Sequence, residues 1–542
     1  MQNTDIFKTY DMVVALTQKT INDQLRRLLA LGVIRDKLII TKSFDANGNF
    51  SYEVLENEAD IPGFTQGKPT VAFINGDLLP QISIDRSGTD VSFRLNFVGG
   101  TAGFYAGPVI RQHDMTGWTY AIDIDLDLLE ISREDLQAHK AVPAHVKQQL
   151  TQFQDQFFTV NSLFVDFESV NLLKFNPTKS TAGAGGDAAL QDLVLFMQFY
   201  LGGLKKDNNP YILGYSLSTS DKTEFKPNQK VPASLRPVGA TFNVFHDPVS
   251  PARSTLNFLI VTEEGSGPIR TRPQTFDTNW ISPAEQVDGK LIYSEKRFMT
   301  PLILEPYYDA FQSGVFEKIR NQISVNAGNT YAQGTRRTAN GYGFVVSDQD
   351  GGHDKYKSSY QVEFDAHGDD LNVSFRSGSL YVYKQKNKDI GPKIKGHVIG
   401  CTAKFWVDGT INWNGAITLS ATKDASGEPI VKPAASMSVT SYPDWKPHEN
   451  SCAKAAGILA LILGSILDSL TGGLDRGFFT NLIERAIQQN LGDFGPLADS
   501  VQNIGQVSTI VYLPAGDVFA FKDPAADPAG NFSLGLTYQS QT

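Results

Sequence analysis

The stretch MTGWTYAIDIDLDLLEI, residues 115–131, decides the fold class of this chain. From position 118 to position 128, large apolar side chains alternate with polar ones. The apolar set is Trp118, Tyr120, Ile122, Ile124, Leu126 and Leu128, and the polar set is Thr119, Asp123, Asp125 and Asp127. Because successive side chains of a strand point to opposite faces of a sheet, this period of two predicts a long β-strand with one buried face and one solvated face.

Similar alternation recurs along the chain, so strands dominate the predicted fold. Residues 38–56 hold two short alternating runs around the sequence Asp-Ala-Asn-Gly, which is typical of a β-hairpin turn. Proline and glycine turns interrupt the last β segment of the chain. Further strands are predicted at 91–105, 192–204, 211–219, 240–247, 254–264, 359–367, 371–385, 397–409, 410–422 and within 509–538.

Helical spacing of apolar residues appears in a few places. Residues 9–31 predict a helix that stops at Gly32, and residues 132–158 predict another, with Ser132 as N-cap and Asp135 three residues later. Helices are also predicted at 309–323, 452–470 and 477–489, and loops at the glycine-rich residues 178–189 and the proline-punctuated residues 429–447.

These elements predict an α+β protein in which a few helices pack against long antiparallel strands. No short repeat period emerges, which disfavours solenoids and propellers. At 542 residues, length alone allows three or four domains. The concentration of apolar residues in long strands favours one elongated body instead, with two β-rich halves, residues 1–330 and 331–542.

Composition excludes some partners. The formal net charge is −10, and no dense basic tract is visible, so we expect no nucleic-acid binding. The best basic run, Lys384 to Lys395, is predicted to be a solvated hairpin or loop. The two cysteines, Cys401 and Cys452, match no zinc pattern; we expect reduced thiols and leave a single bridge open.

Targeting features are also missing from the sequence pattern. The N-terminus lacks a basic region followed by an apolar one, so we expect synthesis in the cytoplasm, with any release independent of a cleavable signal peptide. The longest apolar stretch, residues 455–467, is shorter than the roughly 20 residues that a membrane-spanning helix needs.

Catalytic and metal-binding patterns are weak throughout. The turn with Asp348, Asp350, His353 and Asp354 could supply oxygen ligands for a divalent cation, but a polar turn between strands explains it as well. The aspartates of residues 115–131 are interpreted as a solvated sheet face rather than acid–base machinery. We therefore expect no enzyme, no metal and no cofactor, and a hydrolase is kept as the least favoured alternative.

The candidate ligand-binding elements are two predicted helices, the N-terminal helix at residues 9–31 and the helix that contains residues 455–467. Residues 455–467 are apolar on all sides, so this helix needs cover from a sheet, an acyl chain or a membrane interface. Plain core packing remains open for both helices. The predicted lining of an apolar groove is Val14, Ile21, Leu25, Ile458, Leu461, Ile462 and Ile466.

Four stretches together resemble one known family. They are YDMVVALTQKTINDQL (10–25), MTGWTYAIDIDL (115–126), STLNFLIVTEE (254–264) and VYLPAGDVFAFKDPAADPAGNFSLGLTY (511–538). They resemble the 47-kDa proteins encoded beside botulinum neurotoxin genes, which are related to the OrfX proteins. The chain is longer than that name implies, so it carries insertions relative to the family.

The resemblance implies the tubular lipid-binding (TULIP) fold, in which strongly curved antiparallel sheets wrap around long helices. It also implies an accessory role in bacterial toxin clusters, which in some members is linked to insecticidal activity. Lipid binding is implied by the superfamily, and no ligand residue is carried over.

The function expected from the sequence is non-enzymatic binding of lipid or another apolar ligand, as an accessory or component of a toxin-like complex. The expected partners are a lipid or membrane surface and proteins encoded nearby. The alternative is a purely structural or protein-interaction component whose groove is filled by its own side chains.

Overall fold

The structure is a computed structural model of the 542-residue chain. It describes residues 3–139, 142–155, 158–165, 175–204, 209–219, 233–262, 279–304, 330–332, 337–338, 341–350, 354–391, 393–394, 397–398, 400–423, 425, 429–441, 446–455, 511–516 and 518–539.

The chain divides into two compact units. Unit 1 comprises residues 1–292, 506–520 and 535–542, and unit 2 comprises residues 293–505 and 521–534. The terminal strands β24 (Val518–Ala526) and β25 (Phe532–Gln539) therefore contribute to both. The predicted division at residue 330 stays a prediction, because residues 305–329 lie outside the described part of the chain.

Unit 1 is built on a nine-stranded sheet whose order is β23-β9-β8-β7-β5-β4-β2-β3, with β6 paired to β5. The described strand pairs are antiparallel. The strands are β2 (Lys37–Phe44), β3 (Phe50–Leu55), β4 (Ala72–Ser83), β5 (Asp90–Ala106), β6 (Val109–Asp114), β7 (Thr119–Ile131), β8 (Phe158–Val165), β9 (Ile212–Thr219) and β23 (Val511–Tyr512).

Strand β7 confirms the alternation that defined the fold class. Its apolar side chains at Tyr120, Ile122 and Ile124 are almost fully buried, whereas Asp125 is exposed. The predicted hairpin is also confirmed, since β2 and β3 pair from Ile39 through Phe44 across the expected turn.

The N-terminal prediction is partly wrong. The first half of the predicted helix, Met12–Thr17, is strand β1, every residue of which is buried and which pairs with β11 (Thr255–Thr262). The run MVVALT suits a strand buried on both faces, which sequence periodicity cannot distinguish from a buried helix. In the same sheet β10 (Pro237–Phe245) flanks β11, and β12 (Gly289–Tyr293) lies on the other side of β1.

Helix α1 (Gln18–Ala30) begins where β1 ends, with Thr17 as its N-cap. It lies against β4 beyond Asp77, where β2 no longer pairs with that strand. There the buried Asn22 amide accepts from the Ile82 N–H and donates to the Ile82 carbonyl, at 2.8 and 2.9 Å. Polar side chains of α1 thus complete the hydrogen bonds of an open strand edge, which would otherwise be costly to bury.

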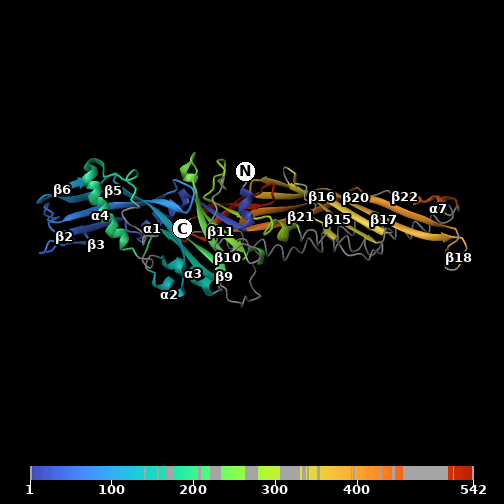
Figure 1. Ribbon diagram of the computed structural model, residues 1–542, viewed down its shortest axis with the longest axis horizontal. Coiled ribbons are helices and arrows are strands. Elements are labelled where there is room, and N and C mark those ends of the chain that lie inside the picture. Colours follow the sequence, from blue (N-terminus) through green and yellow to red (C-terminus); the bar gives the residue numbers. More distant parts are fainter. Residues whose placement is uncertain are drawn as a thin grey trace. The chain divides into compact units, whose positions relative to one another are not determined.

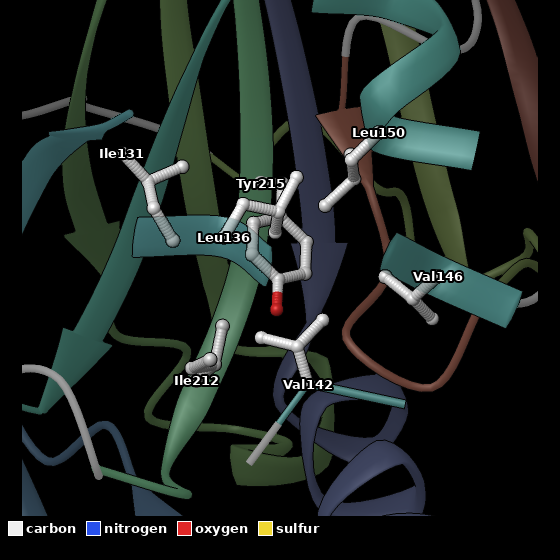
Figure 2. Packing of buried hydrophobic residues seen from close by; sticks show 7 residues of the cluster. All are labelled: Ile131, Leu136, Val142, Val146, Leu150, Ile212 and Tyr215. Atoms are coloured by element: carbon white, nitrogen blue, oxygen red, sulfur yellow. The ribbon is translucent and has the colours of Figure 1, made fainter. Parts of the chain in front are cut away.

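The predicted helix at 132–158 is wrong in its length. Ser132 does cap a helix by accepting from the Asp135 N–H, but α2 (Arg133–Ala138) ends after six residues and α3 (Ala144–Asp155) begins just after Pro143. Figure 2 shows aliphatic side chains from both helices gathered around the Tyr215 ring. The cluster comprises Ile131, Leu136, Val142, Val146, Leu150, Ile212 and Tyr215.

Helix α4 (Gly186–Gly202) overturns the strand predicted at 192–204 and takes the last four residues, 186–189, of the loop predicted at 178–189. Its buried residues recur at helical spacing, from Ala189 through Leu193 and Phe196 to Tyr200. Because the segment also contains an almost continuous apolar run, the sequence pattern alone favoured a buried strand.

Unit 2 contains an eight-stranded sheet in the order β13-β15-β16-β17-β20-β21, with β14 on β15 and β22 on β20. Its long central strands bury Val373, Phe375 and Trp413, among others. The strands are β13 (Thr330–Ala332), β14 (Arg337–Thr338), β15 (Gly341–Asp350), β16 (Asp354–His367), β17 (Asp370–Ile390), β20 (Cys401–Lys423), β21 (Pro429–Ser441) and β22 (Lys446–Glu449).

Two predictions for unit 2 are wrong in detail. The predicted loop at 429–447 is mostly strands β21 and β22, since β21 pairs with β20 along most of its length. The two strands predicted at 397–409 and 410–422 form one strand, β20. Residues 299–304 form a short π-helix ahead of the segment 309–323.

The two cysteines are paired, which corrects the expectation of reduced thiols. The disulfide joins Cys401 at the start of β20 to Cys452 in α7 (Ser451–Ala455), with Cα atoms 6.0 Å apart. The side chain of Asn450 supports this junction, since it accepts from the Lys404 N–H and donates to the Thr402 carbonyl.

The β-rich part of the predicted fold is thus confirmed, with antiparallel sheets and few helices. The long enclosed helix of a TULIP fold is not confirmed, because the longest described helix, α4, has 17 residues. The helices predicted at 309–323 and 477–489, and most of 452–470, lie outside the described residues. No helix in the described ranges is long and apolar enough to cross a bilayer.

Candidate functional site

The predicted groove residues that the structure describes are core residues. Val14 lies in β1 opposite Phe258 of β11, and Ile21 and Leu25 lie on α1. All three side chains are at most 4% exposed. They stay predictions as ligand-binding residues, and so do Ile458, Leu461, Ile462 and Ile466, which lie outside the described residues.

One of the β7 aspartates, Asp123, forms an ion pair within the fold. Asp123 pairs with Lys179 at 3.0 Å, and Lys179 also reaches Asp85 at 2.6 Å. Burial opposes ionisation of Asp123, but hydrogen bonds from Lys179 and Asn176 outweigh it and hold its pKa below the ordinary value. The predicted solvated face is therefore partly covered at Asp123, whose charge is paired with that of Lys179.

The predicted cation turn is only partly described, because residues 351–353, which include His353, lie outside the described ranges. Asp350 and Asp354 are backbone-paired at the end of the β15–β16 ladder. Across the described residues, no group of three or more potential metal-ligating side chains comes together.

Exposed apolar side chains gather instead at the tips of two hairpins of unit 1. Figure 1 shows β2, β3, β5, β6 and α4 together in one region of this unit. Phe44 and Phe50 flank the β2–β3 turn and are 52% and 59% exposed, and Tyr105 and Val109 flank the β5–β6 turn. We refer to five aromatic residues as the hairpin aromatic patch: Phe44, Phe50, Tyr52, Tyr105 and Phe199.

The register of the first hairpin places these rings on one face. Phe44 is paired with Phe50, and Lys42 is paired with Tyr52 two positions further from the turn. Side chains of directly paired residues and of residues two apart share a face of the sheet. The Phe44 and Phe50 ring centroids are therefore 6.5 Å apart, in an edge-to-face arrangement.

The second hairpin and helix α4 extend the patch. Tyr105 lies 5.3 Å from Phe44 between ring centroids, and its hydroxyl donates to the Lys42 carbonyl at 3.2 Å. Tyr52 stacks on Phe199 of α4, with centroids 5.1 Å apart. Residues from three separate stretches of sequence therefore make one aromatic surface.

The side chain of Lys42 lies among the rings of the hairpin. Its Nζ atom is 4.9 Å from the Phe50 ring centroid, 5.5 Å from that of Tyr52 and 6.0 Å from that of Phe44. At such distances the electron-rich ring faces attract a cation. Lys42 thus places one positive charge in the otherwise apolar patch.

An acidic group borders the patch from α4. Burial raises the pKa of the Asp192 carboxyl above its ordinary value, although the nearby Lys42 and His113 charges pull it down. Burial also raises the pKa of Tyr52, with a smaller contribution from Asp192. The inner border of the patch is therefore less hydrated than its tip.

The turn at the tip is held by its own carboxylate. Asp45 accepts hydrogen bonds from the backbone N–H groups of Asn47 and Asn49 and from the Asn49 side chain, at 2.8 to 3.0 Å. These bonds, the side-chain bond first, keep the pKa of Asp45 below its ordinary value. Gly48 has a positive φ of 81°, which glycine adopts without strain. The tip therefore presents its two phenylalanines from a well-defined turn.

Sequence reasoning predicted the hairpin but did not identify the patch. The available pattern was a phenylalanine on each side of the turn, on the same face as Lys42 and Tyr52. Phe199 could not be added, because α4 was predicted to be a strand.

Comparisons with known proteins gave structural neighbours only. No family model matches the chain, and no curated protein matches it. Similar solved structures are P47 from Clostridium botulinum A2 (11% identity, 98% of both chains, TM-score 0.42) and P47 of Clostridium botulinum E1 (12% identity, 98% and 99% of the chains, TM-score 0.41). A third is a lipopolysaccharide-binding protein (11% identity, 98% and 100% of the chains, TM-score 0.31). The 47-kDa proteins that the sequence resembles are thus among the structural neighbours.

Proposed function

We propose that this protein is a non-enzymatic lipid-binding protein that meets a membrane surface through the hairpin aromatic patch. The observation that carries the proposal is the pair of exposed phenylalanines, Phe44 and Phe50, at the tip of a hairpin whose turn is hydrogen-bonded, with Lys42 beside them. Aromatic rings favour the interface between water and lipid, and a lysine there can reach the headgroups while its stem stays in apolar surroundings.

The exposed ring area is large enough to drive such binding. A phenylalanine buries about 200 Å² when fully enclosed, so exposures of 52% and 59% leave about 100 Å² or more on each ring. At about 25 cal/mol per Å², removing this area from water is worth about 2.5 kcal/mol or more per ring. Because an interface covers only part of the area, we expect the two rings together to contribute about 100-fold in partitioning.

The charged residue in the β2–β3 turn, Asp45, costs less free energy to bring to a membrane surface than an exposed carboxylate without hydrogen bonds would. The carboxylate of Asp45 already accepts three hydrogen bonds from the turn. A charged group that keeps its hydrogen bonds costs less to move towards a less polar medium than one that depends on water. The hairpin tip can therefore approach the headgroups as a unit.

The test is flotation of the full chain with vesicles of phosphatidylcholine and phosphatidylglycerol. We expect the native protein to float, and the double variant Phe44→Ser, Phe50→Ser to partition about 100-fold more weakly. Val249→Ser is the matched control, because Val249 is an apolar residue that is 88% exposed and lies outside the patch. Equal flotation of the double variant and the native protein would overturn the proposal.

The proposal extends to a role as an accessory or component of a bacterial toxin-like complex, in keeping with the sequence resemblance. Binding of the purified chain to proteins encoded beside its gene tests this part. Insecticidal activity is the biological outcome proposed for such a complex, and feeding assays with and without the chain measure it.

A second function, a structural or interaction component with a filled interior, is favoured by one observation. Val14, Ile21 and Leu25, the described part of the predicted groove, are packed inside the protein. This alternative predicts that organic extracts of the native protein contain no stoichiometric lipid. Mass spectrometry of such extracts separates lipid carried inside the protein from lipid met only at the patch.

A further inference from the structure

Three rings of the first hairpin form the walls of a cage around the Lys42 ammonium. The Phe50 ring is nearly perpendicular to both neighbours, with interplanar angles of 78° to Phe44 and 81° to Tyr52. The ammonium lies 4.9 to 6.0 Å from the three centroids. Walls at right angles around a cation are the arrangement in which several ring faces attract it at once.

The chemistry of the cage suits a cation without N–H groups better than a lysine. A lysine ammonium carries three hydrogen-bond donors, and ring faces satisfy them less well than water or carboxylates do. A quaternary ammonium has no donor to satisfy and is recognised by aromatic cages of this kind. The positive charge of Lys42 thus occupies a place that a methylated ammonium fits without losing hydrogen bonds.

The geometry points to the cage as a binding site for the quaternary ammonium of a choline headgroup, which displaces the Lys42 ammonium when the hairpin aromatic patch meets a phosphatidylcholine surface. This inference rests on the proposed function and names the lipid class for the same site. The displaced Lys42 remains beside the cage on its flexible stem, where it can pair with the phosphate of the same headgroup.

The surrounding charges agree with a zwitterionic headgroup. Asp192 of α4 acts on Lys42 electrostatically, which adds a negative charge near the cage for the ammonium. Asp45 and Glu53 are exposed on the same hairpin, and both repel an anionic membrane. We therefore expect the site to bind a phosphocholine headgroup, which contacts both Lys42 and the cage, more tightly than a purely anionic headgroup, which contacts Lys42 alone.

The test compares partitioning of the native chain into vesicles of phosphatidylcholine and of phosphatidylglycerol with the same acyl chains. We expect about tenfold preference for phosphatidylcholine, the size of effect that a desolvated cation–ring contact provides. Phe50→Leu keeps an apolar side chain at the tip but removes the closest ring face. It should abolish the preference while lowering partitioning into phosphatidylglycerol by no more than a few-fold.

A second measurement separates this inference from the proposed function. Soluble phosphocholine is titrated into the full chain while the chemical shifts of isotope-labelled phenylalanine rings are followed. Saturable shifts in the native protein that are lost in Phe50→Leu support the cage even if no vesicle recruits the protein. Vesicle binding without headgroup preference, or a preference that survives in Phe50→Leu, overturns the cage while leaving the membrane-binding proposal intact. No vesicle binding and no phosphocholine binding overturns both.

Discussion

Replacing Asn22 by leucine tests whether the hydrogen bonds between Asn22 and Ile82 hold helix α1 against β4. The Asn22 side chain is 6% exposed and bonds to both backbone groups of Ile82. Leucine has a similar volume but leaves the Ile82 N–H and carbonyl buried without a partner. Each such group costs about 1–3 kcal/mol, so after partial offset by the apolar side chain we expect a loss of about 2–4 kcal/mol in unfolding free energy.

Urea unfolding measures the loss, and hydrogen-exchange mass spectrometry of peptides that contain Ile82 locates it. Faster exchange should be confined to β4 and α1 in Asn22→Leu. Asp23→Ala is the matched control, since Asp23 is the next residue and forms ion pairs with Lys19 and Arg26 at the surface. Such pairs contribute no more than about 1 kcal/mol. A cost for Asn22→Leu as small as that of the control, with unchanged exchange at Ile82, would show that these hydrogen bonds do not hold α1 against β4.

Three further outcomes are expected. Burial opposes ionisation of Asp247, but hydrogen bonds from the Ser250 amide and Arg253 outweigh it and hold the pKa of Asp247 below its ordinary value. The ionised carboxylate therefore stabilises the folded protein above the unfolded-state pKa, which is near 4. This stabilisation is lost as the pH falls through the lower pKa of Asp247 in the folded protein. Asp247→Asn should therefore cost about 2 kcal/mol at pH 7 and progressively less in acid, measured by urea unfolding at several pH values, and a pH-independent cost would contradict this. Tyr215→Phe should leave thermal stability unchanged or raise it by up to about 1 kcal/mol, because the buried Tyr215 hydroxyl has no hydrogen-bond partner among the described residues. A clear loss of stability in calorimetry would contradict this. Reducing the Cys401–Cys452 bond should destabilise unit 2 by roughly 4 kcal/mol, because the bond closes a loop with a sequence separation of 51 residues. Urea unfolding with reductant should then have its midpoint at a lower urea concentration. Superimposable curves with and without reductant would contradict the pairing.

The features that could be predicted from the sequence are those that depend on a local pattern, either the alternation of apolar and polar residues along a strand or a turn sequence. Strand β7 alternates cleanly between buried and polar side chains, and the β2–β3 hairpin has both alternation and a turn sequence. Both were predicted because a strand with one buried and one solvated face has apolar and polar residues in alternation along its own sequence. The cap at Ser132 was recognised for the same local reason.

The errors fall where tertiary contacts choose between two locally acceptable structures. Segments β1 and α4 are both apolar over many residues, and an apolar run fits a buried strand as well as a buried helix. The first forms a strand because β11 pairs with it, and the second a helix that packs over Tyr52 and Phe104. Neither partner is adjacent in sequence.

The candidate site was predictable only in part. Phe44, Phe50 and Tyr52 follow from the hairpin register, which the sequence predicted, so an aromatic face with Lys42 could have been derived. Tyr105 and Phe199 come from segments about 50 and 150 residues away, and only the folded sheet and α4 bring them to the hairpin. The disulfide was missed because two cysteines 51 residues apart carry no pairing pattern.

The most direct test of the account is the environment of the hairpin tip at a membrane. With the two native cysteines paired, Asn47→Cys offers a single thiol at the β2–β3 turn for an environment-sensitive fluorophore, and Val249→Cys offers one outside the patch. On addition of phosphatidylcholine vesicles, contact through the hairpin aromatic patch predicts a blue-shifted and brighter emission from the label at position 47 and no change at position 249. Vesicle-bound protein whose label at position 47 still reports water, or whose label at position 249 reports lipid instead, would show that the patch is not the membrane contact.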